Sequence, residues 1–384
     1  MLRQPLTLDA VRRRFAACFS TAGAEPVVAF APGRVNLIGD HIDYCGGRVL
    51  PMPIQYGTWV AAAANGTGEI RARSDNAETT IHLTEDRQTP FPAGHWGRFV
   101  AGADAVLGNH GAPCRGMNLL IAGDIPASGL SSSASLSVAL LLAMGALSGS
   151  RLQGLNLALA AQQIEHRHVG VACGLMDQAA VVLGQPDAAL RFDCATQEGQ
   201  AIALGHEQCA IIVADSGVAR SLAASAYNTR LDELARIGSA LDLAPATLAR
   251  TLQTPPELDD PVLTRRARHI ATEQSRVDAA CAALQRGDWC DFGRMLHASH
   301  ASLRDDYAVS CAEVDLLVEI FARQPGCYGA RMTGAGFGGA VVAAVSSDQA
   351  DTCARAAAEA YAGPGGRTLQ TFVARSRGGA RLHD

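Results

Sequence analysis

Apolar positions along the chain fall into two kinds of segment. Short apolar stretches of strand-like length lie at residues 27–30, 59–63, 117–121, 210–213 and 340–345. Longer apolar segments of helix-like length lie at residues 136–147, 155–166 and 263–284. Because the two kinds of segment alternate, the pattern predicts a mixed fold of the α+β or α/β class.

The N-terminal segment has the pattern of an amphipathic surface helix. Thr7 is a candidate helix cap, and three arginines at residues 12–14 interrupt the apolar positions, unlike in a signal peptide. Apolar side chains recur on one face, at Leu8, Val11, Phe15 and Phe19. The longest apolar run, residues 136–147, is well short of the roughly 20 residues that cross a bilayer. We therefore expect a soluble protein with no membrane partner.

Glycine and polar residues divide the chain further. The glycines gather beside apolar runs, at residues 33–47, 123–129, 170–174 and 334–339. The polar run 194–200 separates two apolar segments and suggests a break within residues 185–205. A polar, proline-rich stretch at residues 254–261 is typical of a loop between helices.

Composition excludes several functions. The formal charge is -5 and no basic stretch could follow a phosphate backbone, so nucleic acid is not expected as a partner. All 32 basic residues are arginine, which excludes P-loop and protein-kinase lysines and pyridoxal Schiff bases. Eleven scattered cysteines with no C-x-x-C pair resemble neither a disulfide framework nor a zinc site, and we expect a cytoplasmic protein.

The segment 123–135 has the pattern of an anion site. A strand-like stretch precedes this loop of small residues, and the apolar helix begins near Leu136. Backbone N–H groups at a helix N-terminus attract anions. The hydroxyls of Ser131, Ser132 and Ser133 could donate to phosphate oxygens or hold Mg²⁺. A serine-rich helix cap is the alternative.

A second glycine loop, residues 331–339, precedes a strand-like segment instead of a helix. It therefore differs from a dinucleotide-binding fingerprint, and by itself it could be a tight turn or a bulge.

Polar side chains are densest in residues 31–44. Within eleven residues lie Arg34, Asn36, Asp40, His41, Asp43 and Tyr44. Carboxylates, an imidazole and an amide at such close spacing suit the vicinal hydroxyls of a sugar. A solvated polar loop is the alternative.

Asp177 is an unusual carboxylate, because it lies between Met176 and the apolar residues 179–183. Such a carboxylate is buried and paired, functional, or a cap of the helix that follows. The nearby His166 and His168 are two residues apart and would point away from each other on a helix, so they do not suggest a metal triad.

Together these segments resemble the galactokinase branch of the GHMP small-molecule kinases. Residues 33–44 resemble the galactokinase signature, and residues 129–135 and 333–339 resemble the second and third family motifs. Further resemblance runs through residues 173–178, 266–269 and 299–311, so it covers nearly the whole chain.

The resemblance implies an α+β fold of two GHMP domains with the active site in the cleft between them. The N-terminal domain would span residues 1–190 and hold the signature, the phosphate loop and the catalytic aspartate. The C-terminal domain would span residues 191–384 and hold the third motif, with a last strand that could return to the first domain. The implied activity is transfer of a phosphoryl group from ATP, with Mg²⁺, to O1 of D-galactose. The sequence leaves the oligomeric state open, and a monomer is compatible with it.

The resemblance also assigns roles around the sugar. Asp177 would face the anomeric hydroxyl, with Arg34 beside it and the γ-phosphate. Asp43 would bind ring hydroxyls, and Asp40 and His41 would lie near C6. Gly174 would also contact the sugar, and Tyr227 would close its pocket.

For the nucleotide, the resemblance places Trp96 by the adenine and Gly334 and Gly336 at the floor of the site. Ser133 and Glu165 would hold Mg²⁺. The ATP phosphates would be wrapped by Gly129, Leu130, Ser131, Ser132, Ser133 and Ala134. Arginine, magnesium and backbone dipoles would then neutralise the transferring group without any lysine.

The chain departs from the family pattern in three places. The phosphate loop is one residue shorter between Pro126 and Gly129, Asp40 replaces a glutamate, and Ala219-Arg220 replaces an Arg-His pair. The alternatives are a kinase for N-acetylgalactosamine or another galactose derivative and a sugar sensor without turnover. A mevalonate or homoserine kinase fits the polar signature less well than a sugar kinase.

Overall fold

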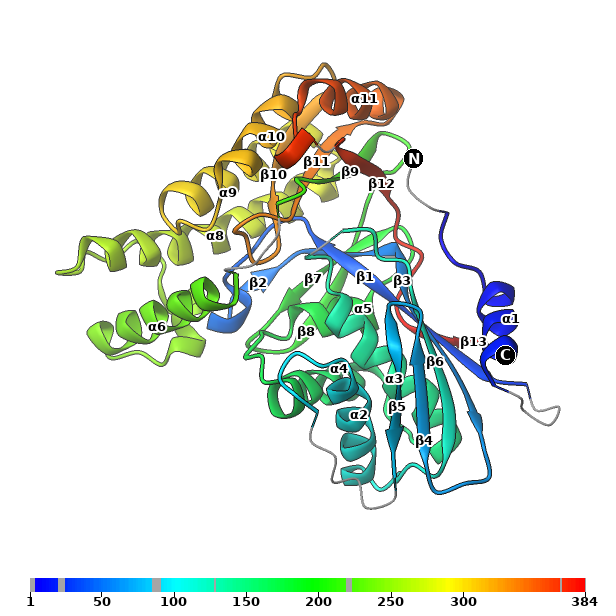
Figure 1. Cartoon of the computed structure of the whole chain (residues 1–384). Helices are drawn as coiled ribbons and strands as arrows, with labels where there is room; N and C mark the ends of the chain where they lie inside the picture. Colours follow the sequence, from blue (N-terminus) through cyan, green and yellow to red (C-terminus); the bar gives the residue numbers. More distant parts are fainter. Residues whose placement is uncertain are drawn as a thin grey trace.

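The computed structural model describes residues 4–19, 25–84, 91–127, 129–218, 223–366 and 368–383. Two main sheets lie in different parts of the molecule, and the long strands β1 and β3 reach from the first sheet toward the second (Figure 1). Short helices connect the main elements, at Asp43–Cys45, Ile164–Val169, Pro245–Thr247, Ser347–Gln349 and Pro364–Gly366.

The first sheet has six strands in the order β13–β1–β3–β6–β4–β5. Its strands are β1 (Val27–Asn36), β3 (Pro51–Ala64), β4 (Ile70–Ser74), β5 (Ala77–Leu83), β6 (Met117–Gly123) and β13 (Arg381–His383). β4 runs parallel to β6, and the other neighbours are antiparallel. β13 pairs with β1, so the end of the chain returns to the sheet that the first strand enters.

Alternating side chains of this sheet face two different cores. On one face, Ala29 and Val60 pack under helices α2 (Gly97–Asn109), α3 (Ser132–Ser148), α4 (Gly154–Gln163) and α5 (Met176–Leu183). On the other face, Phe30 and Trp59 pack against Val11 and Phe15 of α1 (Leu8–Cys18). Since successive strand residues point to opposite faces, both faces of β1 and β3 are apolar and both are covered.

The second sheet has four antiparallel strands in the order β10–β11–β9–β12. They are β9 (Cys209–Asp215), β10 (Cys327–Thr333), β11 (Ala340–Ser346) and β12 (Gln370–Ala374). The helices of this part are α6 (Ala223–Leu241), α7 (Leu248–Thr251), α8 (Pro261–Arg286), α9 (Trp289–Asp305), α10 (Ala312–Ala322) and α11 (Ala350–Ala360). α9 and α10 pack on β10, and α8 packs on α9 (Figure 1).

A third sheet joins β2 (Arg48–Val49), β7 (Ala188–Asp193) and β8 (Glu198–Ala203). The polar run 194–200, where we expected a break, lies in the β7–β8 hairpin, and β7 itself runs across residue 190. The boundary between domains at residue 190 therefore stays a prediction.

The strand-like and helix-like segments of the sequence are strands and helices in the structure. Thr7 caps α1, because its side chain accepts a hydrogen bond from the backbone N–H of Ala10. The helix expected at residues 155–166 ends as α4 at Gln163 and continues as a π-helix, Ile164–Val169. Such single π-turns occur frequently at functional sites. In the described part of the chain, we find no helix with the length and apolar content that a membrane span requires.

Candidate active site

Two adjacent pockets contain most of the side chains singled out in the sequence. The smaller one, which we call the inner pocket, has a volume of about 370 Å³. The larger one, the outer pocket, has a volume of about 700 Å³. Ser133 lines both, so the two pockets meet at the start of α3. The inner pocket is lined by Arg34, Asp40, His41, Asp43, Tyr44, Ser133, Glu165, residues 170–174, Met176, Asp177, Tyr227, Asn228, Gly334 and Ala335.

An arginine–aspartate pair occupies the wall of the inner pocket. Arg34 lies on β1 just after a register shift, and Asp177 lies in the first turn of α5. The Nε and Nη2 atoms of Arg34 lie 2.8 and 2.6 Å from Oδ1 of Asp177. Because both contacts use the same oxygen, Arg34 leaves Oδ2 unengaged. The N-cap of α5 is Leu175, so the alternative that Asp177 caps this helix is wrong.

The same arginine holds the phosphate loop. Its Nη1 donates to the carbonyl oxygen of Gly129 at 2.7 Å, and its backbone N–H donates to that of Leu130 at 3.0 Å. Arg34 is only 5% exposed, so these bonds and the ion pair compensate for the burial of its charge. One side chain therefore fixes the distance between Asp177 and the loop.

Asp43 is the carboxylate beside this pair. Burial raises the pKa of Asp43 to about 7, and the negative charges of Asp177 and Asp40 raise it as well. Gly174 lies directly against it, because a Cβ atom at residue 174 would come within 1.9 Å of Oδ2 of Asp43. Only glycine allows this close approach.

Asp40 is fixed by contacts from the second glycine loop, residues 331–339, and from His269 of α8. Its Oδ2 lies 2.5 Å from Nη2 of Arg331, and its Oδ1 accepts a hydrogen bond from the backbone N–H of Gly334 at 2.9 Å. Its backbone oxygen accepts a bond from Nε2 of His269 at 3.1 Å. Asp40 is only 1% exposed, and the carboxylate therefore sits at the bottom of the pocket with a fixed orientation.

His41 is oriented through both ring nitrogens. Its Nε2 donates to the carbonyl oxygen of Ala335 at 3.2 Å, so Nδ1 accepts the hydrogen bond from the Tyr44 hydroxyl at 2.8 Å. The Tyr44 oxygen then accepts from the Tyr307 hydroxyl at 3.0 Å. Burial lowers the pKa of His41 to about 3, so the ring is neutral. Tyr227 packs edge-on against Tyr44, with ring centroids 5.7 Å apart.

The expected phosphate loop has the predicted context of strand, loop and helix. β6 ends at Gly123 and α3 begins at Ser132, with Gly129 and Ser131 at φ values of 85° and 60°. Ser132 and Ser133 line the outer pocket at the N-terminus of α3, where the first backbone N–H groups of a helix have no intrahelical acceptor. This end of the helix can therefore bind an anion. Leu130 and Ala134 are buried behind the loop and line neither pocket.

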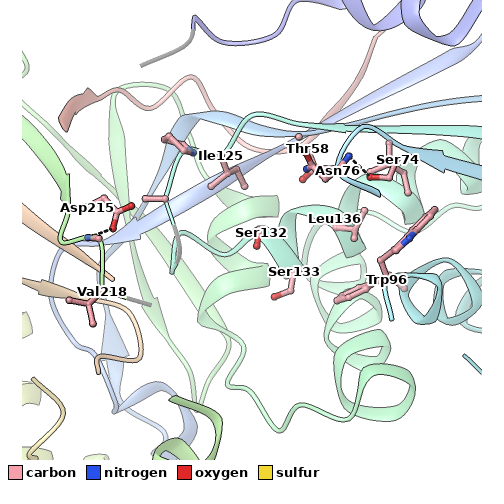
Figure 2. A pocket seen from close by; sticks show the side chains of 16 residues that line it. Thr58, Ser74, Asn76, Trp96, Ile125, Ser132, Ser133, Leu136, Asp215 and Val218 are labelled. Atoms are coloured by element: carbon pink, nitrogen blue, oxygen red, sulfur yellow. Dashed lines mark hydrogen bonds between the residues drawn. The ribbon is translucent and has the colours of Figure 1, made fainter. Parts of the chain in front are cut away.

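The walls of the outer pocket come from both main sheets. Figure 2 shows Trp96 and Leu136 on one side, Asp215 and Val218 on the other, and Ser132 and Ser133 between them. Sequence reasoning named Trp96 and the serines for this site. It missed several polar residues that line the pocket from strands and turns, Thr58, Ser74, Asn76 and Asp215. Their scattered positions carry no local motif.

Glu165 lies in the π-helix and is only 3% exposed. Its Oε1 accepts a hydrogen bond from Nε2 of Gln178 at 2.6 Å. Burial raises the pKa of Glu165 to about 7, a hydrogen bond from Ser133 opposes this rise, and the charge of Asp177 adds to it. A buried carboxylate beside a hydroxyl is a donor set that suits Mg²⁺, which prefers oxygen ligands and keeps several waters. No cluster of three His, Cys, Asp or Glu side chains in the described ranges could hold a metal by itself.

The remaining expected residues, Gly334 and Gly336, belong to the second glycine loop. Gly334 lines the inner pocket, whereas Gly336 lines neither pocket. Gly336 has a φ of 81°, and a Cβ atom there would come within 2.2 Å of the Val309 carbonyl oxygen. Gly336 therefore allows the loop to pack closely against the Val309 backbone, on the side away from the inner pocket. Ala219 and Arg220 lie outside the described residues.

Comparison with known families defines the class of protein. The model "GHMP kinases N terminal domain" matches residues 98–185, and "GHMP kinases C terminal" matches residues 280–363. These two models place the chain among the GHMP kinases. A third model, "Galactokinase galactose-binding signature", matches residues 13–64, which include Arg34, Asp40 and Asp43.

Individual relatives give the particular family. The galactokinase of Roseiflexus sp. is 40% identical over 370 residues, which cover 93% of each chain. The galactokinase of Homo sapiens is 36% identical over 393 residues, covering 99% of this chain and 98% of that one. A crystal structure of Lactococcus lactis galactokinase complexed with galactose has a TM-score of 0.89 and 32% identity, and covers 97% of this chain and 99% of that one. The chain belongs to the galactokinase family.

Proposed function

We propose that this protein phosphorylates D-galactose at O1 with ATP. The observation that carries the proposal is the position of Asp177. Arg34 holds it in the inner pocket, which meets the outer pocket at Ser133. A sugar in the inner pocket and a nucleotide in the outer pocket would therefore present their reacting groups to each other at this junction. Holding two reactants in such an orientation is a large part of catalysis.

The proposed acceptor of the sugar proton is Asp177. Arg34 contacts its Oδ1, so Oδ2 can accept the hydrogen bond of the O1 hydroxyl. As O1 attacks phosphorus and the bond to the leaving nucleotide oxygen breaks, the proton passes from O1 to this carboxylate. The Arg34 guanidinium stays beside the reacting group and compensates its negative charge.

The remaining pocket residues would bind and orient the two substrates. We assign ring hydroxyls to Asp43, Asp40, His41 and the backbone at Gly174, with Tyr227 closing the pocket. The burial of Asp40 and His41 and the position of all five residues in the wall of the inner pocket support this assignment. The helix end at Ser132 and Ser133 would bind the ATP phosphates, and Trp96 would stack on the adenine in the apolar end of the outer pocket.

Ser133 and Glu165 would hold Mg²⁺, as the buried Glu165 carboxylate and the half-buried Ser133 hydroxyl are oxygen donors that suit this ion. When bound, Mg²⁺ supplies positive charge to the phosphate oxygens. The dependence on ATP and the free thiols of the cysteines support a cytoplasmic location.

The test is ADP release by the purified protein with MgATP and one sugar at a time: galactose, N-acetylgalactosamine, galacturonate, glucose or arabinose. We expect strong turnover of galactose, with a mass increase of one phosphoryl group in the product. Turnover of another sugar alone would retain the chemistry and change the substrate. Binding of galactose and ATP without turnover of any sugar would instead identify a sensor.

A further inference from the structure

Arg331 is a buried arginine whose role the sequence did not suggest. It lies on β10 with no exposed surface, and it heads the largest fully buried side chains of the described residues. It lines neither the inner nor the outer pocket. Its Nη2 nevertheless lies 2.5 Å from Oδ2 of Asp40, which does line the inner pocket. Any influence of Arg331 on a substrate would therefore pass through Asp40.

The other contacts of Arg331 join two segments that are far apart in the sequence. Its Nη1 donates to the backbone carbonyl oxygens of Leu37 at 3.1 Å and Asn36 at 3.3 Å. These residues lie at and just beyond the end of β1, about 290 positions earlier in the sequence. One guanidinium thus binds the backbone before Asp40 and the carboxylate of Asp40 at the same time.

The loop that follows Arg331 repeats this connection. The backbone N–H of Gly334 donates to Oδ1 of Asp40 at 2.9 Å, and the carbonyl oxygen of Ala335 accepts from Nε2 of His41 at 3.2 Å. Gly334, Ala335, Asp40 and His41 all line the inner pocket. A shift of β10 at Arg331 would therefore move two pocket side chains of the signature together with two pocket residues of the loop.

A contribution to stability does not by itself account for the buried Arg331–Asp40 pair. The desolvation of a buried ion pair consumes most of its attraction, and apolar residues of similar volume often stabilise a protein as well or better. The Arg331–Asp40 pair lies beside Asp43, an acidic group for which no ion pair is found in the described part of the chain. Arg331 therefore compensates the charge of one carboxylate in a pocket that holds several.

We propose that Arg331 is a positioning residue for the sugar: it fixes the Asp40 carboxylate, and through the Gly334–Ala335 backbone also His41, against one hydroxyl of the substrate. The proposal rests on the proposed galactose phosphorylation. It assigns Arg331 no contact with the sugar or with ATP. A change at Arg331 should thus alter sugar recognition and leave nucleotide recognition nearly unchanged.

The test compares Arg331→Lys with the matched control Arg266→Lys. Arg266 is also a buried arginine that pairs with a carboxylate, with its Nε 2.9 Å from Oε2 of Glu233, but neither residue lines a pocket. Lysine keeps the charge and loses the planar set of donors that binds Asp40 and two carbonyl groups at once. We expect the KM for galactose to rise about tenfold in Arg331→Lys, which corresponds to about 1.4 kcal/mol. The KM for ATP should change less than twofold, and the control should leave both values near those of the wild type.

A series of deoxy sugars distinguishes a positioning role of Arg331 from a merely structural one, because a structural defect would lower kcat/KM equally for every sugar. For 2-, 3-, 4- and 6-deoxygalactose, we compare kcat/KM of Arg331→Lys with that of the wild type. The tenfold loss should disappear for the one deoxy sugar that lacks the hydroxyl facing Asp40, and persist for the others. An equal loss for every sugar, or an equal rise in the KM for ATP, would overturn the proposal.

Asp40→Asn provides a second route if Arg331→Lys does not fold. It keeps the shape of the side chain and removes the charge that Arg331 meets. It should show the same selective loss and the same insensitive deoxy sugar, whereas a loss that is uniform across the sugars contradicts the proposal. Calorimetric titration with galactose separates this result from a failure of the proposed function. If the wild type binds galactose without turnover, the affinity of each variant still reports on positioning.

Discussion

The inner and outer pockets differ in volume and in the chemistry of the side chains that line them. The inner pocket is the smaller, and five charged side chains line it: Arg34, Asp40, Asp43, Glu165 and Asp177. The outer pocket has about twice the volume, and Asp215 is the one charged side chain among the described residues that line it. The inner pocket is thus built for a small polar ligand that is held by directed bonds. The outer pocket offers a helix end and apolar walls to a larger ligand.

The two pockets also differ in how the chain assembles them. The centre of the outer pocket is a continuous segment, in which β6, the phosphate loop and α3 follow one another. The inner pocket depends on contacts between segments far apart, such as Arg34 with Asp177 and Arg331 with Asp40. Because charged groups in a buried site have few alternative partners, single substitutions should cost more in the inner pocket.

The largest expected effect is that of Asp177→Asn in the inner pocket. Asparagine has nearly the same shape but cannot take up the proton of the sugar hydroxyl. We expect kcat to fall by roughly 10² to 10⁴, the usual contribution of a positioned base. Galactose binding, measured by calorimetry, should stay within a few fold of the wild type, since the carboxylate acts mainly in the transition state.

Asp305→Asn is the matched control for this prediction. Asp305 also pairs with an arginine, with its Oδ1 2.8 Å from Nε of Arg304, but it lies on α9 with 60% of its side chain exposed. This exposed pair should contribute little, so kcat should be unchanged. Near-normal turnover by Asp177→Asn would remove Asp177 from the proton transfer and leave it at most an orienting role.

Local sequence patterns predicted only the centre of the outer pocket, whereas most residues of the inner pocket were assigned through a family resemblance. A strand, a loop of small residues and an apolar helix are local patterns, so the strand–loop–helix arrangement around Ser131–133 was predictable from neighbouring residues alone. The roles of Asp43 and Asp177 came from a family resemblance. Local evidence for Asp177 is divided between a helix cap and a functional carboxylate. The structure decides against the cap, because Leu175 is the N-cap of α5, and it pairs Asp177 with Arg34, 143 positions away.

The Arg331–Asp40 pair lay beyond sequence reasoning. Asp40 and Arg331 each lie in a motif of the sequence, residues 31–44 and 331–339. Their pairing, however, depends on the packing of β10 beside the end of β1. A one-dimensional pattern contains no signal for a contact between residues almost 300 positions apart. The burial of Gly336 behind its loop was unpredictable for the same reason, because it depends on the Val309 backbone.

The next largest effect should follow from Trp96→Ala in the outer pocket. The indole forms part of the apolar wall near Leu136 (Figure 2). Stacking of a base on an aromatic side chain contributes roughly 1–3 kcal/mol, so the KM for ATP should rise roughly 5- to 150-fold. The KM for galactose should hardly change, because Trp96 does not line the inner pocket.

Two further variants control for this result. Trp96→Phe keeps an aromatic face and should show a smaller rise in the KM for ATP. Trp289→Ala removes a tryptophan at the start of α9, which lines neither pocket, and should leave both KM values unchanged. A rise in the KM for galactose equal to that for ATP would contradict the prediction, because it would show that Trp96 affects both pockets.

The smallest effect concerns stability, and it tests the crowding of carboxylates in the inner pocket. Burial, with the charges of Asp177 and Asp40, raises the pKa of Asp43 to about 7, well above its ordinary value of 3.8. The folded protein therefore binds this proton more tightly than the unfolded chain does. The stabilisation is fully present below the ordinary pKa of 3.8 and is lost as the pH rises from there through 7. Between pH 6 and 8 the free energy of unfolding of the wild type should fall by about 1 kcal/mol from this group.

Asp43→Asn isolates that contribution, because asparagine has the same shape and no proton to lose. Urea unfolding of both proteins at pH 5, 6, 7 and 8, without ligands, should show a shallower loss of stability in the variant across the window. The difference between the two curves should fall steeply from pH 5 to 7 and become flat above pH 8. Glu165→Gln serves as the comparison, since the pKa of Glu165 is also raised to about 7 and its removal should flatten the same window. Parallel curves for the wild type and Asp43→Asn would mean that the pKa of Asp43 is the same in the folded and unfolded protein. The carboxylates of the inner pocket would then not raise one another's pKa values, and the contrast with the outer pocket would be lost.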